Sequence, residues 1–196
     1  MIASFYSIFI DRALRQLRHA IPEFAGMKEG QRALDVCCGT GDQAVHLARL
    51  GIDAWGIDLD PKMIAVANGR RKRYDKDNLH FQIADAAALP FENGFFDYAT
   101  VSLALHEKPL EVQKKVIGEM RRVVKKGGSL VLADFSVPSQ RFFRFIESLV
   151  GGEHYANFKA YQASGGLERL AETLELDIEK RGAVMGGGVQ LLKIRN

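Results

Sequence analysis

The residues best suited to chemistry are carboxylates that lie close to a pair of glycines. Gly39 and Gly41 follow an apolar run that ends at Val36, and an apolar helical pattern begins at Ala44. This pattern predicts a buried strand, a tight turn and a helix. Because glycine lacks a Cβ and can adopt positive φ, a ligand could lie against this backbone and face the amides that begin the helix. We interpret the turn as a cofactor-binding corner.

Acidic residues recur at or near the ends of the predicted strands, at Asp35, Asp58, Asp85 and Asp97. In open parallel sheets, ligands bind beyond the carboxyl ends of the strands. Asp58 lies seventeen residues after Gly41, close to the spacing of about 20 expected for a carboxylate that binds a ribose diol. Asp58 could instead cap the helix that begins at Pro61, but Asp60 is available for that role.

The charge around the glycine turn separates two classes of cofactor. Asp35 precedes the glycines and Asp42 lies within the turn. Carboxylates in these places would repel a pyrophosphate and attract an ammonium group. S-adenosylmethionine carries an ammonium and a sulfonium group and no phosphate. An NAD(P)-dependent oxidoreductase, which would also want a glycine where Ala44 stands, is the weaker alternative. A third possible class of protein is a non-catalytic module that binds an adenosyl cofactor.

Length and composition bound the remaining possibilities. A chain of 196 residues with 47% hydrophobic and 26% charged residues predicts one globular domain. The net charge of +3 is too small to predict a nucleic-acid partner. The first ten residues lack the basic start of a signal peptide, and no apolar run approaches the ~20 residues of a membrane span. We therefore expect a soluble, cytoplasmic protein with at most peripheral membrane contact.

Two short segments suggest sites that we do not favour. The adjacent Cys37 and Cys38 lack a second ligand pair for zinc, so we expect no metal site there and interpret both as small packing residues. The basic run over residues 70–73 is typical of a solvated helix end, where cations suit the helix dipole. An anionic partner or a membrane surface is the alternative.

Alternating patterns predict the elements that must hold these residues. The predicted strands cover residues 33–36, 54–58, 79–83, 96–105, 129–135, 176–180 and 189–194. The predicted helices cover residues 4–20, where Pro22 ends the helix, then begin near 44 and 61, and cover 109–124, 141–150 and 167–174. Strands that alternate with helices indicate a parallel sheet covered on both faces. The last two strands predict a hairpin at the sheet edge.

The chain resembles the class I S-adenosylmethionine-dependent methyltransferases over nearly its whole length. The resemblance is carried by residues 34–44 (glycine-rich motif), 56–63 (acidic second motif), 85–91 with 96–97 (third and fourth motifs), and 122–128 running into 134–136, with Lys126 where proline is commoner. Leu89-Pro90-Phe91 and Phe135-Ser136 are similar to the ubiquinone and menaquinone C-methyltransferases. The resemblance implies a single domain over residues 1–196 with an α/β, Rossmann-like fold. We expect a seven-stranded, mostly parallel sheet with helices on both faces and a C-terminal antiparallel hairpin.

The resemblance also implies roles for residues around S-adenosylmethionine, whose product is S-adenosylhomocysteine. Asp58 would bind the ribose hydroxyls and Leu59 would pack on the adenine. Asp85 would accept a hydrogen bond from the adenine amino group, and Ala86 would supply a backbone amide.

The methionine portion would lie on the glycine turn. Gly39 and Gly41 would line it, and Asp35 would lie near its amino group. These assignments agree with the chemistry expected from the residue types alone.

His106 is the candidate catalytic residue. It follows the fourth predicted strand, where the family places residues that face the acceptor, and imidazole titrates near neutrality as a base must. The alternative is an orienting or surface histidine. His154 and Tyr155 are weaker candidates. The quinone enzymes usually carry Arg-Asn where this chain has His106-Glu107.

Two apolar segments lie outside the alternating core. They are a helical cap over residues 1–25, which includes Tyr6, and a helical insertion over residues 137–175. We expect them to form a lid over the acceptor; the alternative is that they only cover the sheet. We therefore expect methyl transfer to a small apolar or aromatic acceptor, with quinone-like molecules among the candidates, and no nucleic-acid partner. The oligomeric state is not defined by the sequence.

Overall fold

The computed structural model describes residues 2–74 and 77–196, without the side chains of residues 2–13, 142, 146 and 150. The helices are α1 (Ile2–Ala25), α2 (Asp42–Arg49), α3 (Pro61–Arg71), α4 (Leu110–Val123), α5 (Arg141–Val150), α6 (Gly152–Ser164) and α7 (Gly166–Thr173). The strands are β1 (Arg32–Val36), β2 (Asp53–Asp58), β3 (Leu79–Ile83), β4 (Phe96–Ser102), β5 (Val124–Phe135), β6 (Asp177–Val184) and β7 (Val189–Arg195).

The strands form one sheet in the order β3-β2-β1-β4-β5-β7-β6. Strands β1 to β5 pair in parallel, whereas β7 pairs antiparallel with both β5 and β6. The predicted seven-stranded α/β sheet with a closing hairpin is confirmed. The strand order reverses between β1 and β4, and ligands in such sheets bind beyond the carboxyl ends at that point.

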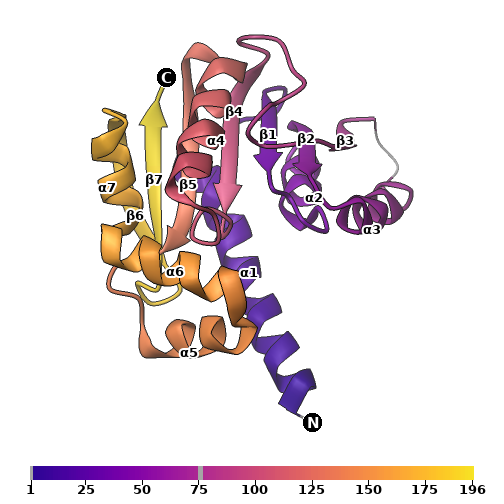
Figure 1. Cartoon of the computed structure of the whole chain (residues 1–196). Helices are drawn as coiled ribbons and strands as arrows, with labels where there is room; N and C mark the ends of the chain where they lie inside the picture. The colour runs from indigo at the N-terminus through magenta and orange to yellow at the C-terminus, as the bar shows by residue number, and fades with distance from the viewer. Residues whose placement is uncertain (1, 75–76) are drawn as a thin grey trace.

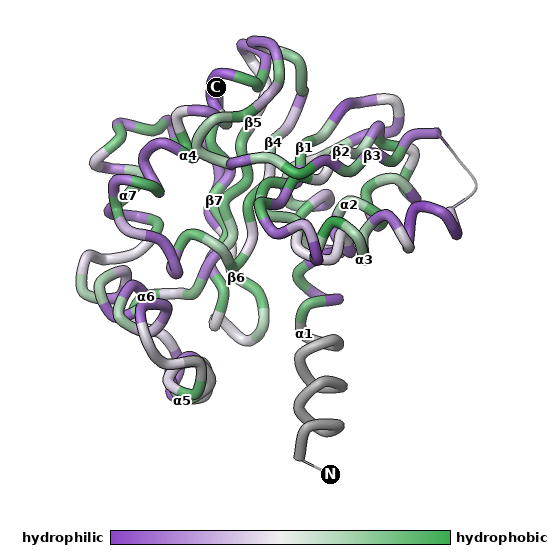
Figure 2. Tube along the Cα trace, turned by 45° about the vertical axis from the view of Figure 1, so that its right-hand side comes forward, coloured by the Kyte–Doolittle hydropathy of each residue, from purple (hydrophilic) through white to green (hydrophobic). Residues whose placement is uncertain are grey.

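The core lies between the sheet and the helices on its two faces. In β5, residues 129–135 are all buried, as expected for a strand covered on both sides. Helix α4 buries Val116, Ile117 and Met120, whose spacing places them on one face of the helix. Hydrophobic segments accordingly gather in the central strands, and hydrophilic ones lie along the outer helices α2 and α3 (Figure 2).

Helix α1 continues through Pro22 to Ala25, so the prediction that Pro22 ends it was wrong. Proline has no N–H, which leaves the carbonyl of Arg18 without its donor from within the helix. Gln43 supplies one from α2, since its Nε2 donates to Arg18 O at 3.3 Å. A tertiary contact therefore compensates for the proline.

The second half of α1 packs against the sheet. Leu17, Ile21 and Ala25 are buried in the main hydrophobic core. This part of α1 therefore covers the sheet, which was the alternative to a lid. Tyr6, considered above as a lid residue, lies outside the described side chains.

Two strand boundaries differ from the predicted ones. Strand β4 ends at Ser102 rather than at residue 105, since Leu103 adopts a positive φ of 51°. Strand β5 begins at Val124, directly after α4, where Val124 pairs with Phe96. The glycines at 127 and 128 therefore lie within an irregular part of the strand and do not end the helix.

Helices α5 and α6 lie across the end of the sheet toward which the arrow of β4 points (Figure 1). Helix α6 was not among the predicted helices, although it lies within the predicted helical insertion. Gly151 separates α5 from α6, and both Gly151 and Gly152, the first residue of α6, adopt positive φ. No helix in the described part of the chain is long and apolar enough to cross a membrane.

Candidate active site

The first two sequence motifs meet at the carboxyl edge of the sheet through Asp58, the last residue of β2. Its Oδ2 accepts the N–H of Gly39, and its Oδ1 accepts the N–H of Asp60, both at 2.9 Å. Asp60 caps α3 by accepting the N–H of Lys62. Asp58 is therefore not the helix cap. It orders the glycine turn and keeps acceptor capacity on both oxygens.

The two glycines of the turn have different surroundings. Gly41 has a φ of 80°, and a Cβ there would lie 2.5 Å from Cζ of Phe81, so a close approach requires glycine. Gly39 has a φ of 52°, but a Cβ would meet no atom within 4 Å. Gly41 is thus needed for packing, whereas Gly39 borders space in which a ligand could lie.

Asp35 of β1 is a buried carboxyl group with one free oxygen. It is 1% exposed, and Thr100 Oγ1 donates to its Oδ1 at 3.2 Å. Oδ2 completes no hydrogen bond within the described residues. Burial raises the pKa of Asp35 to about 7, although Thr100 and the amide of Ala44 act in the opposite direction. A buried oxygen without a partner is costly unless a ligand satisfies it.

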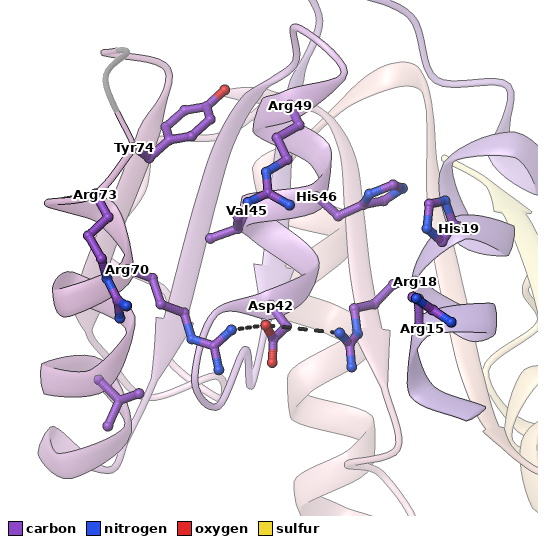
Figure 3. Close-up of a pocket in the computed structure, with 11 residues that line it drawn as sticks. Arg15, Arg18, His19, Asp42, Val45, His46, Arg49, Arg70, Arg73 and Tyr74 are labelled. Carbon is purple, nitrogen blue, oxygen red and sulfur yellow. Dashed lines mark hydrogen bonds and ion pairs between the residues drawn. The ribbon is translucent and has the colours of Figure 1, made fainter. Parts of the chain in front are cut away.

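Asp42, which was expected to attract an ammonium group together with Asp35, is already paired. It forms an ion pair with Arg70 of α3, and its Oδ1 is 3.9 Å from Arg18 of α1 (Figure 3). The two guanidinium groups neutralise its charge. Of these two carboxylates, Asp35 alone remains for a cationic ligand.

The cavity beside Asp42 is strongly basic. Its volume is about 610 Å³, and it lies between α1, α2 and α3. Its lining includes Arg15, Arg18, Arg49, Arg70, Arg73, His19 and His46 (Figure 3). Burial and the neighbouring cations lower the pKa of His46. Of the basic run over residues 70–73, which was predicted to be a solvated helix end, Arg70 and Arg73 line this cavity.

Apolar side chains border the expected adenine position. Leu59 is 68% exposed and Ile83 is 52% exposed, and Ile83 is the register partner of Asp58. Asp85 is exposed and accepts the N–H of Ala87 at 2.8 Å. Within the described residues the N–H of Ala86 has no acceptor. Sequence reasoning missed Ile83, which an apolar residue ending a predicted strand could have signalled.

His106 is held by a buried carboxylate that had been assigned no role. It is 3% exposed, and its Nδ1 lies 2.7 Å from Oδ1 of Asp134 in β5. Asp134 also accepts the backbone N–H groups of Leu105, His106 and Phe135. Burial alone would lower the pKa of His106, but nearby carboxylates outweigh it and raise that pKa.

The helical insertion brings two further groups to His106. Glu147 of α5 is 7% exposed, and its Oε2 lies 3.7 Å from His106 Nε2. The same oxygen lies 2.6 Å from Nε2 of His154 in α6. His154 was a weak candidate, and Glu147 was missed because nothing in the local pattern distinguishes it from other helical glutamates.

Cys37 and Cys38 were interpreted as small packing residues. Burial raises the pKa of Cys37 to about 12 and that of Cys38 further, which favours packing over thiolate chemistry.

Asp97 was expected near a carboxyl strand end, but it is the second residue of β4. It accepts the N–H of Arg32 and pairs with Lys125 at the opposite edge.

The chain is similar to known proteins both in sequence and in fold. The model of the ubiE/COQ5 methyltransferase family matches residues 3–149. The chain is 39% identical to a demethylmenaquinone methyltransferase of Renibacterium salmoninarum over 132 residues, which cover 67% of this chain and 53% of that protein. It is 33% identical to one of Bacillus mycoides over 146 residues, which cover 69% and 61%. The match thus spans little more than half the length of these relatives.

Solved structures share the fold. The PH0226 protein of Pyrococcus horikoshii superposes with a TM-score of 0.75 at 19% identity, covering 95% of this chain and 90% of that one. A SAM-dependent methyltransferase of Aquifex aeolicus gives 0.69 at 17% identity, covering 90% and 88%.

Proposed function

Because the chain belongs to the ubiE/COQ5 methyltransferase family, we propose that it transfers a methyl group from S-adenosylmethionine to a small aromatic acceptor. One observation carries the proposal. Asp58, Gly39 and the unpartnered oxygen of Asp35 lie at the carboxyl ends of the paired strands β1 and β2, next to the point where the strand order reverses. This set provides hydrogen-bond acceptors and a negative charge, which suit a cationic nucleoside better than a pyrophosphate.

The residues present fit the proposed cofactor at its methionine end. The open space at Gly39 would admit the ligand backbone. The free Oδ2 of Asp35 would accept a hydrogen bond from the ammonium group, which would also favour the ionised carboxylate. When bound, the cofactor would supply a methyl group activated by its sulfonium.

The adenosine end would be held by β2 and β3. Asp58 would accept hydrogen bonds from the ribose diol while it orders the turn through Gly39. Leu59 and Ile83 would cover the adenine faces, since both are exposed at neighbouring strand ends. Asp85 and the free N–H of Ala86 would bind the edge of the base.

The acceptor would lie between this site and the helical insertion. The names of the relatives point to a quinone-like acceptor. Aromatic side chains surround His106, with Phe135 at 4.7 Å and Phe158 at 6.0 Å between ring centroids. His106 would be the catalytic residue on this side, held in one orientation by Asp134. Alignment of acceptor and methyl group can supply effective molarities on the order of 10⁵ to 10⁸ M.

Three further features belong to the proposal. Residues 1–196 would act as a single domain, with the cap over residues 1–25 and the insertion over residues 137–175 serving as the lid. The protein would work in the cytoplasm, which the two free cysteines support. Contact with a membrane would be peripheral at most, and no nucleic acid would be involved.

A thermal-shift comparison tests the cofactor assignment. S-adenosylhomocysteine at about 100 times its Kd should stabilise the fold by about 2.7 kcal/mol, and NAD and NADP should leave it unchanged. Stabilisation by the nicotinamides alone would favour the oxidoreductase alternative and overturn the proposal.

A second assay tests catalysis. Radiolabelled S-adenosylmethionine is incubated with a reduced demethylmenaquinone analogue, and label in the organic phase is measured. We expect transfer that S-adenosylhomocysteine inhibits. Binding without transfer to a panel of quinols and phenols would instead indicate the non-catalytic module.

A further inference from the structure

His106, Glu147 and His154 form a cluster with the composition of a metal site. One ligand atom from each of them lies within 4.8 Å of the other two. They come from the loop after β4, from α5 and from α6, so the cluster joins the helical insertion to the end of the sheet. Two imidazoles and one carboxylate are the ligand set of many catalytic zinc sites.

One separation within the cluster is a hydrogen bond, and the other is close to that of two ligands that share an ion. Oε2 of Glu147 lies 2.6 Å from His154 Nε2 but 3.7 Å from His106 Nε2. The longer separation exceeds a hydrogen bond. Two ligands that each lie at 2.0–2.2 Å from a tetrahedral ion stand about 3.3–3.6 Å apart. The 3.7 Å separation is close to this range, and an ion would replace the 2.6 Å hydrogen bond once Glu147 moves away from His154.

Each histidine also has a carboxylate on its other nitrogen. Nδ1 of His106 bonds Oδ1 of Asp134 at 2.7 Å, and Nδ1 of His154 lies 3.4 Å from Oε2 of Glu107. Metal-binding histidines usually donate their second N–H to such a carboxylate, which directs the free lone pair at the ion. Both imidazoles are thus arranged with one nitrogen directed at an acid and the other at Glu147.

We propose that His106, Glu147 and His154 bind one divalent transition-metal ion, for which Zn²⁺ is the best match. Two nitrogen ligands and one oxygen ligand suit a borderline ion better than Mg²⁺ or Ca²⁺. Three protein ligands leave a position open for water or for an acceptor oxygen, as in catalytic zinc sites. The proposal does not depend on methyl transfer, because metal binding can be measured without cofactor or acceptor.

The experiment measures Zn²⁺ binding to the full chain, stripped with a chelator and freed of any polyhistidine tag. Competition with a chromogenic chelator gives the affinity, and elemental analysis gives the stoichiometry. Absorption bands of bound Co²⁺ report the ligand set. We expect one ion per chain, and we expect Mg²⁺ not to compete.

Variants identify the ligands. His154→Ala and the nearly isosteric Glu147→Gln should each weaken Zn²⁺ binding more than about tenfold, and Glu107→Gln should weaken it by about 10- to 100-fold. His46→Ala is the matched control, because His46 meets His19 edge-on in the basic cavity, with 4.2 Å between ring centroids, and forms a rival imidazole pair. Binding of S-adenosylhomocysteine, followed in parallel, reports whether each variant folds.

Three outcomes would overturn the proposal. One is a wild-type chain that retains no stoichiometric Zn²⁺ at micromolar concentration. Another is unchanged affinity in both His154→Ala and Glu147→Gln. The third is loss of binding in His46→Ala. Any of them would leave the cluster as a set of ion pairs that attaches the helical insertion to the sheet.

Discussion

Asp58 Oδ2 accepts the backbone N–H of Gly39 at 2.9 Å, so the carboxylate at the end of β2 directly orders the turn that follows β1. The bond connects two motifs that are nineteen residues apart. Under the proposed function Asp58 has two tasks, since the same side chain would also bind the ribose diol. Loss of the carboxylate should therefore affect both the cofactor and the turn beneath it.

Asp58→Asn should raise the Kd of S-adenosylhomocysteine at least about tenfold, because charge-assisted hydrogen bonds contribute about 1.5–3 kcal/mol. Isothermal titration calorimetry measures the change. Asp60→Ala is the control: it removes the cap of α3 at a cost of about 1 kcal/mol in stability and should leave the affinity unaltered. Equal affinities for Asp58→Asn and the wild type would remove Asp58 from the site.

Asp35 should make cofactor binding pH-dependent. Since its pKa is raised to about 7, the carboxyl group of the free protein ionises between about pH 6 and 8. The affinity for S-adenosylhomocysteine should rise over this range, as the ionised form attracts the ammonium group. In Asp35→Asn the affinity should be lower and the rise should disappear. A wild-type affinity that is flat across these pH values would contradict the assignment.

The same shift has a consequence for stability. The unfolded chain releases the Asp35 proton near the ordinary pKa of 3.8, whereas the folded state keeps it up to about pH 7. Folding is therefore favoured below this window, and the contribution is lost by up to about 1.4 kcal/mol per pH unit as the pH rises through it. Urea denaturation at pH 5 and pH 8 should show a larger loss for the wild type than for Asp35→Asn. Parallel pH profiles of the two proteins would argue against a buried, protonated Asp35.

Alanine at the two glycines of the turn should have separable effects. Gly41→Ala should destabilise the fold by about 1–3 kcal/mol, because its Cβ would collide with Phe81 at a positive φ. Gly39→Ala should cost about 1–2 kcal/mol of backbone strain and, in addition, weaken S-adenosylhomocysteine binding, since its methyl group enters the proposed ligand space. Denaturation and calorimetry measure both. A wild-type affinity in Gly39→Ala would place the ligand elsewhere.

His106→Ala should lower the rate of methyl transfer at least about 10²-fold while the Kd of S-adenosylhomocysteine stays within about threefold. The reason is that His106, held by Asp134, lies on the proposed acceptor side and away from Asp58. His19→Ala, on an exposed part of α1, is the control and should keep both values. If transfer by His106→Ala is normal, His106 is a structural residue.

The contact between Gln43 and α1 should matter for stability alone. Gln43→Ala should lower the free energy of unfolding by about 1 kcal/mol, because the carbonyl of Arg18 loses its donor. In Pro22→Ala the backbone N–H is restored, so the same substitution of Gln43 should then cost less. A double-mutant cycle in urea measures the difference. Additive effects would show that Gln43 does not compensate for the proline.

Much of the fold and half of the candidate site follow from the sequence. The turn at Gly39 and Gly41, the acid at Asp58 and the cap at Asp60 were predictable because each depends on residue type at nearby positions. The alternation of strands and helices likewise predicted the parallel sheet and its closing hairpin. Periodic burial and turn chemistry are local properties that a chain carries in its order of residues.

Only the tertiary structure decided which side chains meet. Asp42 pairs with arginines from α1 and α3, Gln43 reaches the carbonyl exposed by Pro22, and Asp97 lies at the far edge of the sheet. His106 bonds Asp134, 28 residues away, and lies near Glu147 of the helical insertion. Such partners depend on how strands are ordered and how helices pack, and local periodicity does not contain that information.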